Sequence, residues 1–119
     1  MPIRRVVPNI QSDQFAASQN FYADILGFEV AMNLGWIMTF VSPDNPTAQI
    51  SIISQEPSGI HPDVSIEVED VDAVHAKAVA AGIEIVYPLT DEVWGVRRFF
   101  ARDPNGKIIN IVSHHQSSS

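Results

Sequence analysis

The feature that most constrains the fold of this chain is an internal repeat. Gly27-Phe28-Glu29-Val30 and Gly82-Ile83-Glu84-Ile85 lie 55 residues apart, and each follows a segment whose apolar residues have helical spacing. A glycine directly after such a segment is typical of a helix C-terminus. The chain has 119 residues, the size of one domain. We therefore predict a single domain, 1–119, made of two similar modules, 4–55 and 62–113, joined by a loop rich in proline and glycine.

Each half shows the same order of elements. In the first half, the spacing of apolar residues predicts a strand at 4–11, a helix at 13–26 and strands at 28–33, 36–41 and 48–54. The helix is predicted from residues that recur at helical spacing and form a mainly apolar stripe: Phe15, Ser18, Tyr22, Ile25 and Leu26. The second half predicts a strand at 64–68, a helix at 70–81 and strands at 83–87, 96–102 and 108–113. The predicted fold class is α+β, with two βαβββ modules.

Charge and composition exclude several classes of function. The net charge is −7, which disfavours a nucleic-acid surface because such a surface needs a basic footprint. The chain contains no cysteine, which excludes disulfides, thiolate nucleophiles and iron–sulfur clusters. No apolar run approaches the ~18 residues needed to span a bilayer. We expect a cytoplasmic protein that binds neither nucleic acid nor membrane.

Several short motifs occur together in a specific order. They are Ser18-x-x-Phe21-Tyr22-x-x-x-Leu26-Gly27-Phe28, Glu69-Asp70-Val71-Asp72, Arg97-Arg98-Phe99-Phe100-x-x-Asp103-Pro104-Asn105-Gly106 and the terminal strand at 108–112. With this order and spacing the chain resembles the vicinal oxygen chelate superfamily, also called the glyoxalase/bleomycin-resistance/dioxygenase fold. The resemblance implies that the strands of each module form half of a cup that holds a ligand, with the helices outside. It also implies a homodimer.

Enzymes of this family hold a divalent metal in the cup through His, Glu or Gln side chains. The resemblance places the four ligand positions at Val7, Ser51, Asp63 and Asn110, and a shift of two residues would bring His61 to the third of them. Valine cannot coordinate a metal, and neutral serine or asparagine is a poor ligand for Zn²⁺, Ni²⁺ or Fe²⁺. We therefore expect no metal and no other cofactor.

Strand alternation, combined with the resemblance, predicts which side chains face the cup. On the third strand we expect Trp36, Met38 and Phe40 in the cup, with Ile37 and Val41 toward the helices. Trp94 resembles the aromatic lip of antibiotic-binding members. The expected ligand contacts are Asn9, Trp36, Met38, Phe40, Ser51, Glu67, Trp94, Arg98, Phe100 and Asn110. A large apolar surface with a few polar groups suits an organic ligand.

These features predict a metal-independent protein of the bleomycin-resistance type that binds a small aromatic or antibiotic-like molecule and sequesters it. The alternative is a glyoxalase I-like lyase or dioxygenase whose metal site lies elsewhere. A third hypothesis is a metal-free enzyme with Glu67 as general base and Arg98 or Asn110 as oxyanion partner. Glu67 and Arg98 could instead pair with each other and stabilise the fold.

Overall fold

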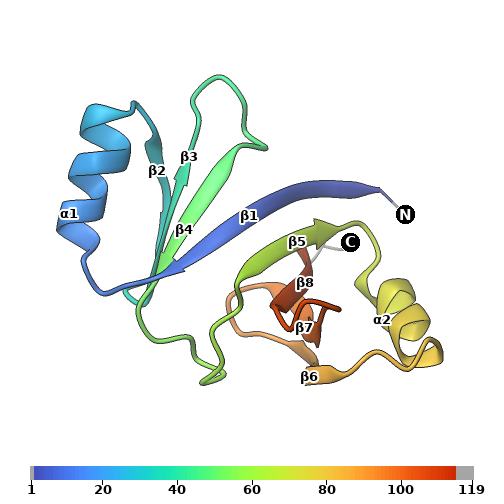
Figure 1. Ribbon diagram of the computed structural model, residues 1–119. Helices are drawn as coiled ribbons and strands as arrows, with labels where there is room; N and C mark the ends of the chain where they lie inside the picture. The colour runs from blue at the N-terminus through green and yellow to red at the C-terminus, as the bar shows by residue number, and fades with distance from the viewer. Residues whose placement is uncertain (1, 115–119) are drawn as a thin grey trace. The chain divides into compact units, whose positions relative to one another are not determined.

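The computed structural model describes residues 2–114 and divides the chain into two units (Figure 1). One unit is Val6–His61. The other combines residues 62–114 with residues 2–5, so the first residues of the chain belong with its second half. Within residues 2–114, no helix is both long and apolar enough to cross a membrane.

The Val6–His61 unit contains one helical segment and one sheet. Its strand order is β2-β3-β4-β1, with β3 antiparallel to both neighbours and β4 parallel to β1. Figure 1 shows the helical segment alongside the strands of this unit. The elements are β1 (Ile3–Gln11, which begins in the other unit), α1 (Phe15–Gln19), η1 (Asn20–Ile25), β2 (Glu29–Asn33), β3 (Ile37–Val41) and β4 (Gln49–Ile53).

The second unit repeats this arrangement. Its strand order is β1-β5-β8-β7-β6, in which only the first residues of β1 belong to this unit. Strands β5 and β8 are parallel, and β7 is antiparallel to both β8 and β6. Its elements are β5 (Val64–Val68), α2 (Val71–Ala80), β6 (Ile85–Asp91), β7 (Val96–Arg102) and β8 (Ile108–His114). The predicted α+β class with two βαβββ modules is confirmed.

Local chemistry sets the ends of these elements. Asp70 caps α2 by accepting a hydrogen bond from the Ala73 N–H at 3.1 Å. The β7–β8 turn is held by Asp103 Oδ1, which accepts from the N–H groups of Lys107 (2.9 Å) and Asn105 (2.8 Å). The hydrogen bond from Lys107 is the main reason that the pKa of Asp103 lies below its usual value.

One strand differs in extent from its prediction. We expected a strand at 83–87 and a loop from Pro88, but β6 runs from Ile85 to Asp91 and includes that proline. Its pairing with β7 shifts register between Tyr87 and Thr90. A proline is tolerated there because β6 is the edge strand of its unit, where a missing backbone donor breaks no ladder.

The core of the Val6–His61 unit corrects the predicted orientation of the third strand. Met38, Phe40 and Ile52 form a buried cluster that packs against Phe15 and Tyr22 of the helical segment. Phe40 is fully buried, and its ring centroid lies 5.3 Å from that of Tyr22. Met38 and Phe40 therefore face the helix. Their expected placement in the cup is wrong.

The core of the other unit follows the predicted orientation. Val68, Val71, Phe99 and Ala101 form its buried cluster, and Val74 and Ala78 of α2 pack against it. The side chains next to Phe99 along β7, Arg98 and Phe100, consequently lie on the opposite face of the sheet.

The helical segment of the Val6–His61 unit also departs from its predicted pattern. Residues Asn20–Ile25 form a π-helix, and the Leu26 N–H donates to the Phe21 carbonyl, five residues back, at 3.1 Å. The wider turn breaks the expected apolar stripe after Tyr22. Ile25 and Leu26, which share the helical spacing of Phe15 and Tyr22 in the sequence, are 66% and 55% exposed.

Replacing Phe40 tests its place in the core. Phe40→Ala should lower the free energy of unfolding by about 3–5 kcal/mol, the range for a buried phenylalanine. Phe21→Ala is the matched control, because Phe21 is 49% exposed; its cost should stay below about 1 kcal/mol. Chemical denaturation followed by far-ultraviolet circular dichroism measures both. Equal effects of the two substitutions would contradict this packing.

Candidate ligand-binding site

In the unit built from residues 62–114 and the first residues of β1, polar side chains gather on the sheet face opposite α2. Cross-strand partners lie on the same face, and here Ser65 lies opposite Asn110, and Asn110 lies opposite Phe100. Arg98 and Glu67 are both opposite Val112, so they share this face as well. We call it the helix-free face; its polar and aromatic residues are Ser65, Glu67, Arg98, Phe100 and Asn110.

The most deeply buried charge on this face is Arg98, which is 3% exposed. Its Nε donates to Glu92 Oε2 at 2.7 Å, and the Tyr87 hydroxyl donates to the same oxygen at 2.8 Å. Three rings surround the guanidinium: Cζ lies 5.2 Å from the centroid of Tyr87, 5.0 Å from Trp94 and 4.8 Å from Phe100. A cation over an aromatic face is stabilised electrostatically.

This arrangement gives Trp94 and Phe100 a role that the sequence did not predict. Both were expected to contact a ligand, and both contact the Arg98 guanidinium. Phe100 is fully buried, whereas Trp94 is half-buried. The sequence analysis missed Tyr87 and Glu92. In the sequence, these two residues are marked only by their position shortly before β7, within the hairpin that leads into it.

Glu67 does not pair with Arg98. Its Oε1 accepts a hydrogen bond from Arg5 Nε, and its Oε2 lies 2.8 Å from His114 Nδ1. The Glu67 side chain is 8% exposed. Both carboxylate oxygens are therefore already engaged by protein groups. These contacts favour a structural role over that of a general base.

Asn110 has an unpartnered oxygen. Its Nδ2 donates to Ser65 Oγ at 3.0 Å, but no donor within residues 2–114 reaches Oδ1, which is buried. Asn110 as a whole is 8% exposed. An unsatisfied buried acceptor costs about 1–3 kcal/mol. A ligand or water that donates a hydrogen bond here would remove that cost.

The remaining predicted contacts lie in the Val6–His61 unit. Asn9 is opposite Ser51, and Ser51 is opposite Thr39, so the three share the sheet face away from the helical segment. The hydroxyls of Thr39 and Ser51 are 2.7 Å apart. Trp36 is half-buried just before β3, and its carbonyl accepts from the Ser54 N–H. On β3, Thr39 therefore lies on this face, where Met38 and Phe40 were expected.

The donor set at the expected metal positions does not fit a divalent metal. Val7 is buried and apolar, and the Ser51 hydroxyl is bonded to Thr39. Asp63 Oδ2 accepts from the Ile108 N–H at 2.9 Å. The strand register instead pairs Asn9 with Ser51 and Ser65 with Asn110, which are four neutral residues. Neutral amide and hydroxyl groups are weak ligands for transition metals.

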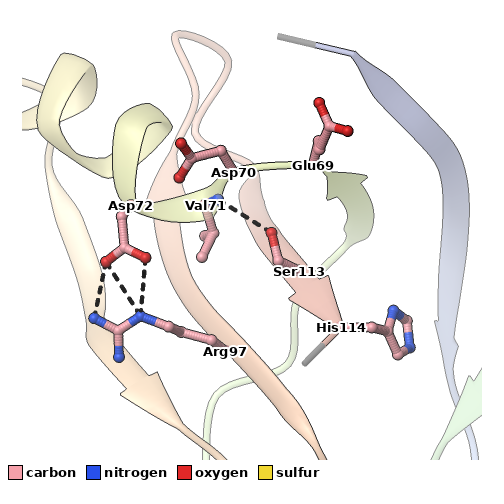
Figure 2. Close-up of a pocket in the computed structure, with 7 residues that line it drawn as sticks. All are labelled: Glu69, Asp70, Val71, Asp72, Arg97, Ser113 and His114. Carbon is pink, nitrogen blue, oxygen red and sulfur yellow. Dashed lines mark hydrogen bonds and ion pairs between the residues drawn. The ribbon is translucent and has the colours of Figure 1, made fainter. Parts of the chain in front are cut away.

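A pocket of about 170 Å³ lies elsewhere in the same unit as Arg98 (Figure 2). Its polar groups bind one another: Arg97 Nη2 lies 2.9 Å from Asp72 Oδ1, and Ser113 Oγ accepts from the Val71 N–H. The hydrogen bonds from Arg97 hold the pKa of Asp72 below its usual value. None of the ten predicted ligand contacts lines this pocket. Its lining is Glu69, Asp70, Val71, Asp72, Arg97, Ser113 and His114.

Comparison with known proteins identifies the family. The chain belongs to the Glyoxalase/Bleomycin resistance protein/Dioxygenase superfamily, whose sequence profile matches residues 4–111. No curated protein matches the chain.

Solved structures share the fold at low sequence identity. An NAD-dependent benzaldehyde dehydrogenase from Legionella pneumophila has a TM-score of 0.72 at 21% identity, covering 92% of this chain and 99% of that one. Methylmalonyl-CoA epimerase from Mycobacterium tuberculosis has a TM-score of 0.71 at 18% identity, with 96% and 88% covered. A superfamily member from Vibrio splendidus 12B01 has a TM-score of 0.65 at 18% identity, with 96% and 100% covered.

The Arg98–Glu92 pair can be tested against an exposed pair of the same kind. Glu92→Gln should lower the free energy of unfolding by about 1.5–3 kcal/mol, as expected for a hydrogen bond to a charged group. Glu84→Gln is the matched control, because the Arg102–Glu84 pair is 39% and 61% exposed; its cost should stay below about 1 kcal/mol. Denaturant titration measures both. A cost of Glu92→Gln no larger than about 1 kcal/mol, the level expected for the exposed control, would contradict this role of Glu92.

Proposed function

We propose that the chain is a metal-independent small-molecule-binding protein of the bleomycin-resistance type, which acts by sequestering an aromatic or antibiotic-like ligand. The observation that carries this proposal is the buried, unpartnered Oδ1 of Asn110 on the helix-free face. Buried polar atoms in native proteins are almost always hydrogen-bonded, so an orphaned acceptor favours a ligand that brings a donor. The proposal includes a homodimer, because β2 and β6 leave unpaired strand edges.

The chemistry of the helix-free face supports binding over turnover. Arg98 and Glu67 are engaged with protein partners, so the charged groups of this face are already neutralised. Asn110 supplies a polar anchor, and the half-buried Trp94 supplies aromatic surface. A few orienting polar groups among apolar ones suit a neutral or cationic organic ligand.

The similar solved structures do not identify a reaction for this chain. The dehydrogenase and the epimerase named above carry different activities on one fold, so the fold by itself does not assign either activity to this chain. A lyase or dioxygenase activity remains the alternative function, and it would require metal ligands other than Val7, Ser51, Asp63 and Asn110.

The anchor role of Asn110 predicts how two substitutions differ. A panel of planar aromatic and glycopeptide-like compounds is screened by quenching of Trp36 and Trp94, the two tryptophans in the chain. Asn110→Leu removes the acceptor and should weaken binding at least about tenfold, equivalent to about 1.4 kcal/mol. Asn110→Asp keeps an oxygen acceptor and should retain more of the affinity.

Asn20→Leu is the control for that experiment, because Asn20 is an exposed asparagine in the other unit. It should bind as the parent does. Unchanged binding in Asn110→Leu would contradict the anchor role. If no compound of the panel binds but a small electrophile or a thiol conjugate is turned over, the binding function is wrong and an enzyme is supported.

Elemental analysis tests the metal-independent part. Protein prepared without a metal-affinity step should contain only substoichiometric Zn, Ni, Mn and Fe, because the expected ligand positions are neutral or already bonded. Ligand binding should also survive treatment with a chelator. A stoichiometric metal together with an activity lost on chelation would overturn the proposal and support the lyase or dioxygenase.

A further inference from the structure

Three apolar side chains stand together on the surface of the Val6–His61 unit. Phe21, Ile25 and Leu26 are 49%, 66% and 55% exposed. The π-type hydrogen bond from the Leu26 N–H to the Phe21 carbonyl places these two residues one turn apart on the same side of the segment, and Ile25 directly precedes Leu26. We call this surface the η1 apolar face. An exposed apolar cluster rimmed by polar groups is typical of an interaction site.

The charged side chains of the unit that carries this face, apart from histidine, are all acidic. The Val6–His61 unit contains five carboxylates and no lysine or arginine, so all seven basic side chains of the protein lie in the other unit. Three of the carboxylates, on Asp13, Asp24 and Glu29, are exposed on or next to the helical segment. Within residues 2–114 none of these three forms an ion pair, whereas Arg4, Arg97 and Arg102 all do.

We propose that the η1 apolar face binds a basic amphipathic helix of another protein. Such a helix offers apolar side chains for Phe21, Ile25 and Leu26, and its lysines or arginines meet the surrounding carboxylates. Charge complementarity decides between possible occupants. A second copy docked through the same face would oppose like charges, and an anionic membrane would repel them. This surface is independent of the proposed ligand-binding function.

The test uses three labelled synthetic peptides and fluorescence anisotropy. The first is an amphipathic helix of leucine and lysine, the second has glutamate in place of lysine, and the third is the first in scrambled order. The leucine–lysine helix should bind at least about tenfold tighter than either control, a difference equivalent to about 1.4 kcal/mol. Its affinity should fall as salt is raised, because the carboxylates are exposed and screened.

Two substitutions locate the binding surface. Ile25→Ser should weaken binding of the leucine–lysine peptide at least about tenfold. Val79→Ser is the matched control: Val79 is equally apolar and 55% exposed, but it lies on α2 of the other unit. It should bind as the parent does. Asp24→Asn should reduce both the affinity and its salt dependence, and circular dichroism verifies the fold of each variant.

Several results would overturn the proposal. They are absent binding of the leucine–lysine peptide, equal binding of the glutamate or scrambled peptide, and equal losses in Ile25→Ser and Val79→Ser. A parent dimer that becomes monomeric in Ile25→Ser, measured by light scattering, would assign the face to a second copy. Sedimentation with anionic vesicles that Ile25→Ser abolishes would assign it to lipid.

Discussion

The burial of Arg98 is the constraint on which the helix-free face depends. A guanidinium on a residue that is 3% exposed requires a carboxylate, and Glu92 supplies one from the turn between β6 and β7. Tyr87 donates to that carboxylate, and the rings of Tyr87, Trp94 and Phe100 cover the cation. One buried charge thus engages residues of β6, of the turn between β6 and β7, and of β7. Trp94 and Phe100, which were predicted from the sequence to contact a ligand, both contact this arginine.

Much of the fold could be predicted because its signals are local. The repeated glycine after each helix and the aspartate turn at Asp103 depend on neighbouring residues, and β5 and β7 have the predicted bounds. The π-helix could not be predicted, because a periodicity argument assumes α-helical spacing throughout. β3 was misoriented for another reason: both of its faces are rich in large side chains, so alternation did not distinguish core from cup.

The candidate site was harder to predict from the sequence, because its interactions join residues that are far apart along the chain. The alternation of Val64, Ile66 and Val68 with polar residues correctly placed Ser65 and Glu67 opposite α2. Nothing in the sequence paired Glu67 with Arg5 and His114, which are 62 and 47 residues away. Many carboxylates compete for few cations in this chain, and only the fold decides which of them meet. The poor ligand set at the expected metal positions, with one carboxylate and three residues that are apolar or neutral, was evident from sequence, since residue type alone excludes most ligands.

Glu67 also connects the two ends of the chain. Arg5, near the N-terminus, and His114, near the C-terminus, bind its two oxygens, and residues 2–5 belong to the same unit as residues 62–114. A short linker could therefore connect the segment at Arg5 to the segment at His114, and new ends could be opened at Gly59, which is exposed. In such a circular permutant the second half of the sequence would precede the first without any strand changing its neighbour. The fold of each half therefore does not depend on which half comes first in the sequence.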